Sequence, residues 1–205
     1  MTVRVKICGL TRRKDAEAAV ELGADLLGFN FYPRSPRYVD PSLARSILAD
    51  LPRAAGTVGV FVNEEAARII AVTAAAGVAM AQLHGDETAE FCAGLPLPAI
   101  KAVRVGGADD LAGIEKYRVW AILIDSKTPG FGGSGEKPDW GLAAQAGGKC
   151  RLILAGGLCP DNVAEAIGAV KPWGVDVASG VESAPGIKDA EKMKRFIEAV
   201  RNVSG

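Results

Sequence analysis

The chain lacks the features that mark membrane, secreted and nucleic-acid-binding proteins. Its 24 lysines and arginines balance 24 aspartates and glutamates, so no net charge attracts nucleic acid or an anionic membrane. No apolar run approaches the roughly 18 residues that span a bilayer. No apolar leader with a cleavage site opens the chain. We therefore expect a cytoplasmic protein with no nucleic-acid partner and no membrane partner.

Cysteine and histidine are too scarce for a disulfide framework or a metal centre. The four cysteines lie far apart without CxxC spacing, and His84 is the only histidine. A zinc site would need several such ligands at short, regular spacing. The sequence thus predicts reduced thiols and no metal.

What the chain does contain is a regular alternation of short apolar segments with helical patterns. Apolar segments of strand length alternate with stretches in which apolar residues recur at helical spacing. We expect eight strands, at 3–8, 26–31, 57–62, 80–83, 100–105, 121–125, 152–155 and 175–178. Helical segments are expected between them and after the last, among them 41–51, 87–92, 109–117, 139–146, 161–170 and one from near 189.

Eight βα units predict an α/β protein that forms a single (β/α)8 TIM barrel with eight parallel strands. Composition does not change along the chain, so residues 1–205 are expected to form one catalytic domain. This length suits the fold, because α/β barrels of about 200–250 residues form one domain. An open doubly wound sheet is the alternative. It would need an edge strand, and every strand here is apolar enough to be buried.

Local signals predict how several helices begin. Thr11 is expected to cap the first helix, and Asn63 is expected to cap the third, with Ile70 facing the core. Pro160 suits the first position of a later helix, where its missing N–H costs nothing.

Reactive side chains gather where the expected strands end. In a (β/α)8 barrel, the carboxyl ends of the strands carry the chemistry. The residues found at those ends are, in chain order, Cys8, Arg34, Arg37, His84, Asp125, Gly156, Gly157, Ser179 and Gly180. One site at this end of the barrel is therefore expected.

Cys8 ends the first strand on the face that does not pack against helices. Val5 and Ile7 take the opposite face, because successive strand residues alternate. A small buried hydrophobe is the usual fate of a cysteine. Lys6 shares the face of Cys8 and would lower the pKa of the thiol if the two side chains approach.

Two glycine turns and Asp125 surround the same end. The turns at Gly156-Gly157 and Ser179-Gly180 follow strands seven and eight, where barrels of this type commonly bind phosphate. Each turn alone is also compatible with a simple tight turn. Asp125 is either a capping or salt-bridge residue or a general acid. A phosphosugar on the two turns would lie between Asp125 and Cys8, which suits one group that removes a proton and another that supplies it.

Two further side chains are candidates for substrate contacts. Arg37 follows strand two in a proline-containing loop, and its guanidinium fork suits a substrate carboxylate. A solvated arginine is the commoner outcome. His84 either orders its loop or contacts the substrate.

These motifs together resemble those of the phosphoribosylanthranilate isomerase family of tryptophan biosynthesis. The resemblance covers the whole chain in order. It rests on residues 6–11 (KICGLT), 31–37 (FYPRSPR), 82–85 (QLHG), Asp125 with 132–135 (GGSG), 154–158 (LAGGL) and 179–182 (SGVE). The resemblance implies an Amadori rearrangement of N-(5-phosphoribosyl)anthranilate to the 1-deoxyribulose derivative, with no cofactor.

The resemblance also implies roles for single residues. Asp125 resembles the general acid that opens the ribose ring, and Cys8 the general base at C2′. Arg37 resembles the residue that binds the anthranilate carboxylate. The two glycine turns resemble the phosphate cradle, and Asp176 is expected to contact ribose. The glycine-rich segment 126–135 is expected to close over a small-molecule phosphosugar-anthranilate substrate. A monomer and a homodimer both remain open.

Two alternatives remain at the level of sequence. Another phosphosugar isomerase barrel, such as a ribonucleotide isomerase of histidine synthesis, would share the phosphate turns. It would present paired aspartates on strands one and five, where this chain has Cys8 and Val105. A non-catalytic phosphometabolite-binding barrel would need neither the thiol nor the carboxylate.

Overall fold

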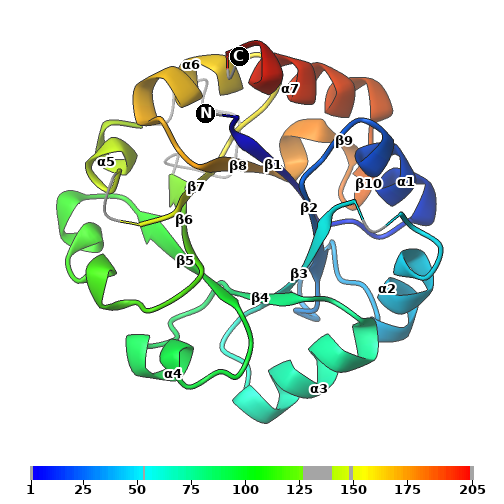
Figure 1. Ribbon diagram of the computed structural model, residues 1–205, viewed down its shortest axis with the longest axis horizontal. Helices are drawn as coiled ribbons and strands as arrows, with labels where there is room; N and C mark the ends of the chain where they lie inside the picture. The colour runs from blue at the N-terminus through cyan, green and yellow to red at the C-terminus, as the bar shows by residue number, and fades with distance from the viewer. Residues whose placement is uncertain (1, 53, 127–139, 148–149, 204–205) are drawn as a thin grey trace.

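Eight parallel strands close into a barrel in the computed structural model, which describes residues 2–52, 54–126, 140–147 and 150–203 (Figure 1). Each strand pairs in parallel with the next, and β8 pairs with β1. The strands are β1 (Arg4–Cys8), β2 (Leu26–Asn30), β3 (Gly56–Phe61), β4 (Met80–Leu83), β5 (Ala99–Val105), β6 (Ala121–Ser126), β7 (Leu152–Ala155) and β8 (Gly174–Val177). The predicted (β/α)8 barrel is thus confirmed, with every strand within one residue of its expected bounds.

The helices surround the ring of strands (Figure 1). They are α1 (Arg13–Glu21), α2 (Pro41–Leu48), α3 (Ala66–Ala76), α4 (Ala89–Ala93), α5 (Trp140–Gln145), α6 (Val163–Val170) and α7 (Ala190–Val203). None of these described helices has the length and apolar character that crossing a membrane requires.

Several predicted helix bounds were wrong. The expected helix at 109–117 is two 3-10 turns, η1 (Ala108–Leu111) and η2 (Ile114–Lys116). Asp110 accepts hydrogen bonds from the backbone N–H groups of Gly106 and Gly107, which ties it to a tight turn. The helix expected at 41–51 ends at Leu48, the one at 87–92 begins two residues late, and the one at 161–170 begins at Val163, beyond Pro160.

The predicted caps were also wrong, because both side chains are used elsewhere. The Thr11 hydroxyl donates to the carbonyl of Gly186, 2.5 Å away, and the helix begins after Arg12. The Asn63 side chain accepts from the backbone N–H of Asp86 at 2.6 Å, and α3 begins three residues later. Ile70 is 39% exposed and does not face the core.

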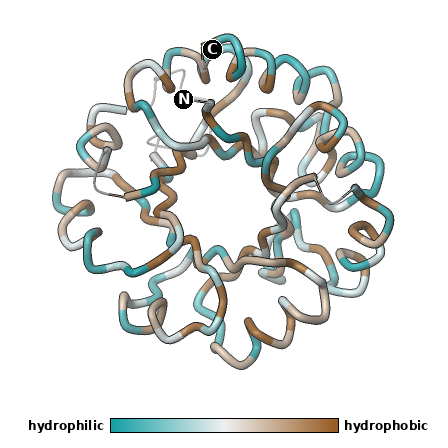
Figure 2. Tube along the Cα trace, in the orientation of Figure 1, coloured by the Kyte–Doolittle hydropathy of each residue, from teal (hydrophilic) through white to brown (hydrophobic). Residues whose placement is uncertain are grey.

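The strand alternation separates two apolar layers. Outward side chains such as Val5 and Ile7 pack beneath the helices, whereas Leu26, Val58 and Leu123 belong to a second cluster inside the barrel. Figure 2 shows the apolar residues concentrated along the ring of strands. At the carboxyl ends of the strands, the side chains that point into the barrel are polar and no longer apolar.

One feature of the fold was not predicted. After β8 the chain forms a 3-10 turn, η3 (Ser179–Val181), and then a short antiparallel hairpin of β9 (Glu182–Ala184) and β10 (Ile187–Lys188). The hairpin lies beside α1, near the ends of β1 and β2 (Figure 1). Its position is fixed by the bond from Thr11 to Gly186 and by a bond from the Lys188 N–H to Asp15.

Candidate active site

A cavity of about 340 Å³ opens at the carboxyl ends of the barrel strands. Its walls combine a thiol, carboxylates, one guanidinium, one imidazole and the two glycine turns. It is lined by Cys8, Gly9, Asn30, Arg37, Val60, Gln82, His84, Asp125, Ala155, Gly156, Gly157, Leu158, Asp176, Val177, Ala178 and Ser179. The structure therefore brings together the site residues that the sequence predicts. Gly180 follows directly after the last of them.

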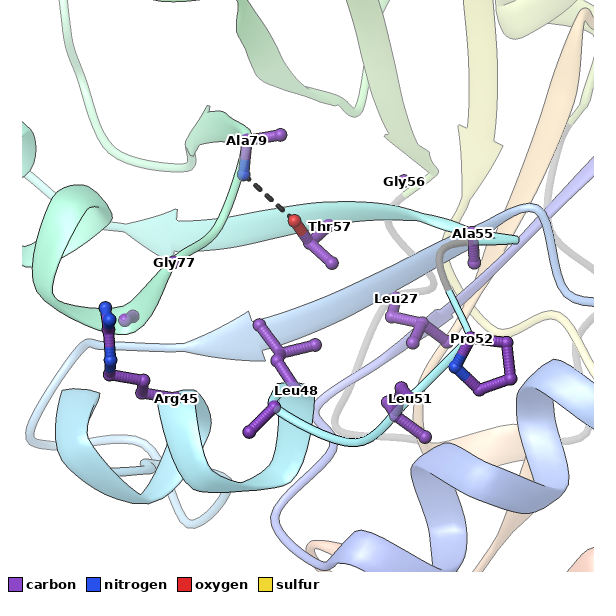
Figure 3. A pocket seen from close by; sticks show the side chains of 12 residues that line it. Leu27, Arg45, Leu48, Leu51, Pro52, Ala55, Gly56, Thr57, Gly77 and Ala79 are labelled. Carbon is purple, nitrogen blue, oxygen red and sulfur yellow. Dashed lines mark hydrogen bonds between the residues drawn. The ribbon is translucent and has the colours of Figure 1, made fainter.

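A larger cavity, of about 530 Å³, lies between α2 and α3 near the amino ends of β3 and β4 (Figure 3). Its walls are mainly aliphatic, and Arg45 is the one ionisable side chain among the described residues that line it. The Thr57 hydroxyl on its wall accepts the backbone N–H of Ala79 at 2.9 Å. The described part of the chain puts no acid–base pair on its walls, so the chemistry belongs to the smaller cavity.

The Cys8 thiol sits beside a buried ion pair. Lys6, which is 1% exposed, donates to the Asp176 carboxylate at 2.7 Å inside the barrel. Burial opposes the charge of Lys6, but Asp176 and Cys8 stabilise it and raise the pKa of Lys6 above its ordinary value. Asp176 thus serves as the partner of Lys6 while it also lines the cavity.

Lys6 does lower the pKa of Cys8, as expected, but burial of the thiol outweighs this effect. Burial raises the pKa of the Cys8 thiol, and the nearby Asp176 charge raises it further. Lys6 acts in the opposite direction, but its effect is smaller than the desolvation. Cys8 is therefore a neutral thiol at neutral pH before a ligand binds.

Asp125 lies at the end of β6 with its side chain 36% exposed to the cavity. Its Oδ2 atom is 3.6 Å from Nε2 of His84, and Nδ1 of His84 is 2.9 Å from the Gln82 amide nitrogen. An imidazole that accepts at Nδ1 carries its proton at Nε2, facing Asp125. His84 is thus placed both to orient Asp125 and to touch a ligand.

Gln82 and Asn30 were not predicted as site residues. Gln82 is 1% exposed, and its amide oxygen has no hydrogen-bond partner among the residues that the structure describes. Gln82 lies on β4, and its side chain points into the barrel. His84 follows two residues later, just after the strand ends. Strand alternation alone would have found Gln82, since an uncharged polar residue at an interior position is unusual.

Arg37 is not a freely solvated arginine. Its Nε atom donates to Glu182 Oε1 at 2.8 Å, and its Nη2 atom donates to Oε2 at 2.7 Å. Glu182 raises the pKa of Arg37 through these bonds. The remaining nitrogen, Nη1, has no hydrogen-bond partner within the described part of the chain, so a ligand carboxylate can take it.

The two glycine turns pack directly on each other. Gly156 and Gly157 have φ angles of 89° and 63°, which favour glycine. A Cβ atom on Gly180 would stand 1.9 Å from the carbonyl oxygen of Leu158. The Asn162 side chain fixes the first turn by donating to the Gly157 carbonyl at 2.9 Å. The backbones of the two turns therefore approach too closely for a side chain at Gly180.

Replacing Gly180 by alanine is expected to lower kcat/KM by roughly a hundredfold, the cost of a displacement of about 1 Å in a positioned site. The added methyl must push one turn away from the other. Steady-state kinetics and binding of inorganic phosphate measure the loss. Gly168→Ala is the matched control, because its Cβ would meet nothing within 4 Å. Normal phosphate affinity in Gly180→Ala would contradict the placement of a phosphate site at these two turns.

Two further expectations concern the glycine-rich segment after β6 and the lack of a metal site. The glycine-rich segment expected to close over the substrate lies, beyond Ser126, outside the described residues. Within those residues no group of three histidine, cysteine or acidic side chains is arranged to hold a metal ion.

Comparison with known proteins finds similarity over nearly the whole chain. The family model described as N-(5'phosphoribosyl)anthranilate (PRA) isomerase matches residues 5–199. A relative of that name from Myxococcus xanthus is 48% identical and covers 100% of this chain and 99% of its own. Another from Geobacter metallireducens is 50% identical and covers 97% and 99%.

Solved structures agree in fold. The phosphoribosyl anthranilate isomerase from Thermotoga maritima superposes with a TM-score of 0.92 at 46% identity, covering 98% of this chain and 99% of that one. A structure of such an isomerase in complex with reduced 1-(o-carboxyphenylamino)-1-deoxyribulose 5-phosphate has a TM-score of 0.89 at 43% identity, with 98% and 99% covered.

Proposed function

Because the chain belongs to the N-(5'-phosphoribosyl)anthranilate isomerase family, the isomerases of tryptophan biosynthesis, we propose that its cavity carries out their Amadori rearrangement. The substrate is N-(5-phospho-β-D-ribosyl)anthranilate, and the product is 1-(2-carboxyphenylamino)-1-deoxy-D-ribulose 5-phosphate. The barrel acts as one catalytic domain without a cofactor. The observation that carries the proposal is that Cys8, Asp125 and both phosphate turns line one cavity.

The first step is acid catalysis by Asp125. Its carboxyl group gives a proton to the ribose ring oxygen as the bond from C1′ to that oxygen breaks, and the nitrogen lone pair forms the Schiff base. Asp125 is supported in this role by its exposure to the cavity and by its neighbour His84, 3.6 Å away. The anion left on Asp125 is stabilised by the imidazole Nε2–H.

The second step is base catalysis by Cys8. The thiolate removes the proton from C2′, and the electrons of that bond form the C1′–C2′ double bond while the π electrons of the C1′–N bond return to nitrogen. The resulting enolamine tautomerises to the ketone. The buried Lys6–Asp176 pair beside the thiol supports the role, because Lys6 favours the thiolate against the burial that disfavours it. Asp176 also contacts the ribose from its place on the cavity wall.

The substrate is held at its two anionic ends. The turns at Gly156-Gly157 and Ser179-Gly180 take the phosphate, and Arg37 takes the anthranilate carboxylate through the nitrogen that Glu182 leaves unused. His84 contributes a further contact near the ring. Both reactive carbons then lie between the general acid and the general base.

Replacing Arg37 by alanine is expected mainly to raise KM, since a carboxylate contact made in both the ground state and the transition state is lost. Arg34→Ala provides a matched control from the same loop. The Arg34 guanidinium is exposed and stacks on the Tyr32 ring, 5.2 Å from its centroid. Steady-state kinetics distinguish the two variants. A large fall in kcat with KM unchanged would contradict the binding role of Arg37.

Turnover of phosphoribosylanthranilate by the purified protein, followed by anthranilate-type fluorescence, tests the function. Tight binding without turnover would instead indicate a phosphometabolite-binding barrel. We further propose a cytoplasmic location and a monomeric or homodimeric state. One structural neighbour from Thermotoga maritima is described as a monomer generated from a dimeric isomerase. Analytical ultracentrifugation separates the two states for this chain.

A further inference from the structure

The hairpin that follows β8 carries a buried carboxylate at the edge of the active site. Glu182, on β9, is 7% exposed and accepts four hydrogen bonds through its two oxygens. Two come from the guanidinium of Arg37, one from the ammonium of Lys188 at 2.8 Å and one from the backbone N–H of Gly186 at 3.2 Å. Oε1 accepts three of these bonds, and Oε2 accepts the one from Nη2 of Arg37.

Lys188 links Glu182 to β1, the strand that ends in Cys8. Its ammonium, which has no exposed surface, also donates to the backbone carbonyls of Cys8 at 2.5 Å and of Ala178 at 3.1 Å. Ala178 directly precedes the phosphate turn at Ser179. Through Lys188, the Glu182 carboxylate therefore connects the Arg37 guanidinium to the carboxyl ends of β1 and β8.

The charge balance of this cluster leaves room for an anionic ligand. Two cations, Arg37 and Lys188, surround one carboxylate. Burial opposes ionisation of Glu182, but the hydrogen bonds from Arg37 and Lys188 prevail and lower its pKa. Glu182 therefore stays ionised, and Arg37 keeps Nε and Nη2 fixed on it, while Nη1 meets no acceptor among the described residues. A bidentate pair fixes the plane of a guanidinium, which a single hydrogen bond does not.

We propose that Glu182 is a positioning residue, which holds the Arg37 guanidinium in the plane that presents Nη1 to the carboxylate of the substrate. The inference rests on the proposed function, because it takes an aromatic carboxylate as the group that Arg37 meets. Glu182 itself does not line the cavity. It acts through Arg37, and its replacement should affect ligands with that carboxylate more than ligands without it.

The test compares two ligands on Glu182→Gln. One ligand is the reduced product analogue, reduced 1-(o-carboxyphenylamino)-1-deoxyribulose 5-phosphate. The other is its anilino counterpart, which lacks the carboxylate and keeps the phosphate. Glutamine keeps the shape of the Glu182 side chain but places an N–H₂ group against hydrogen-bond donors. The Arg37 guanidinium therefore loses its bidentate partner. We expect about tenfold weaker binding of the first ligand and less than about twofold change for the second, within the range measured for contacting residues.

A double-mutant cycle with Arg37→Ala tests whether Glu182 acts through Arg37. With the guanidinium gone, adding Glu182→Gln should change KM by less than about twofold, because coupled residues are not additive. Glu191→Gln, an exposed residue at the start of α7, is the matched control. Equal weakening of both ligands, or full additivity in the cycle, would overturn the proposal in favour of a structural brace.

A second variant guards against loss of folding. Glu182→Asp keeps the buried charge near Lys188 but withdraws the carboxylate from Arg37 by one methylene. It should show the same selective loss for the carboxylate-bearing ligand. Turnover by the unsubstituted protein is measured first. If that protein fails to turn over phosphoribosylanthranilate, the proposed function fails. If it turns over and the selective loss is missing, only the role of Glu182 fails.

Discussion

Replacing Cys8 by alanine is expected to lower kcat at least about a hundredfold, the usual contribution of a general base. KM should change little, because the phosphate turns and Arg37 hold the substrate independently of the thiol. The thiol lies on the cavity wall and is 8% exposed, and alanine puts no proton acceptor in its place. Steady-state kinetics give the result. Cys150→Ala, at a half-buried cysteine outside the cavity, is the control.

The pH profile gives the same prediction a second readout. Burial raises the pKa of Cys8, so the thiol is protonated at neutral pH and the thiolate fraction grows about tenfold per pH unit below that pKa. The rate at which the unsubstituted protein removes the C2′ proton is therefore expected to rise from neutral pH towards alkaline pH. Cys8→Ser should lose this rise, because a serine hydroxyl does not ionise in that range. Near-normal turnover of Cys8→Ala would sink the assignment of the base.

The barrel was predictable because its signals are local. Strand and helix periodicity is visible within each βα unit, and eight units then permit one closed parallel sheet. The two predicted caps failed for the opposite reason. Thr11 bonds to Gly186 and Asn63 to Asp86, partners that lie 175 and 23 residues further along the chain. A capping signal predicts a local bond and has no means of weighing a distant competitor.

The site was predictable to the same extent. Strand alternation and the rule on strand ends placed Cys8 and Asp125 on the wall of one cavity. The raised pKa of Cys8 was not predictable, because it depends on burial and on the charge of Asp176, which pairs with Lys6 from 170 residues away in sequence. Glu182 stood in a recognised motif, but its bonds to Arg37 and Lys188 depend on a short hairpin with no strand periodicity of its own.

Replacing Asp125 by alanine is expected to lower kcat at least about a hundredfold, since the general acid that opens the ribose ring is removed. Asp125→Asn is the closer variant, because the amide keeps the shape beside His84 but has no acidic proton to give. Both should bind the reduced product analogue with nearly unchanged affinity, since that ligand has no closed ring to protonate. His84→Asn is the comparison, and a smaller loss is expected because this variant keeps the acid and removes the imidazole that orients Asp125 and contacts the substrate.

A substrate with deuterium at C2′ decides which group acts at which step. Without its acid, the enzyme should be limited by ring opening, so Asp125→Asn should show almost no isotope effect on kcat. Without its base, proton abstraction should be limiting, so Cys8→Ser should show a clear primary effect. The reverse pattern would exchange the two roles, because the C–H bond at C2′ breaks only in the step that the base performs. The isotope effect thus separates two residues whose losses in kcat alone would look the same.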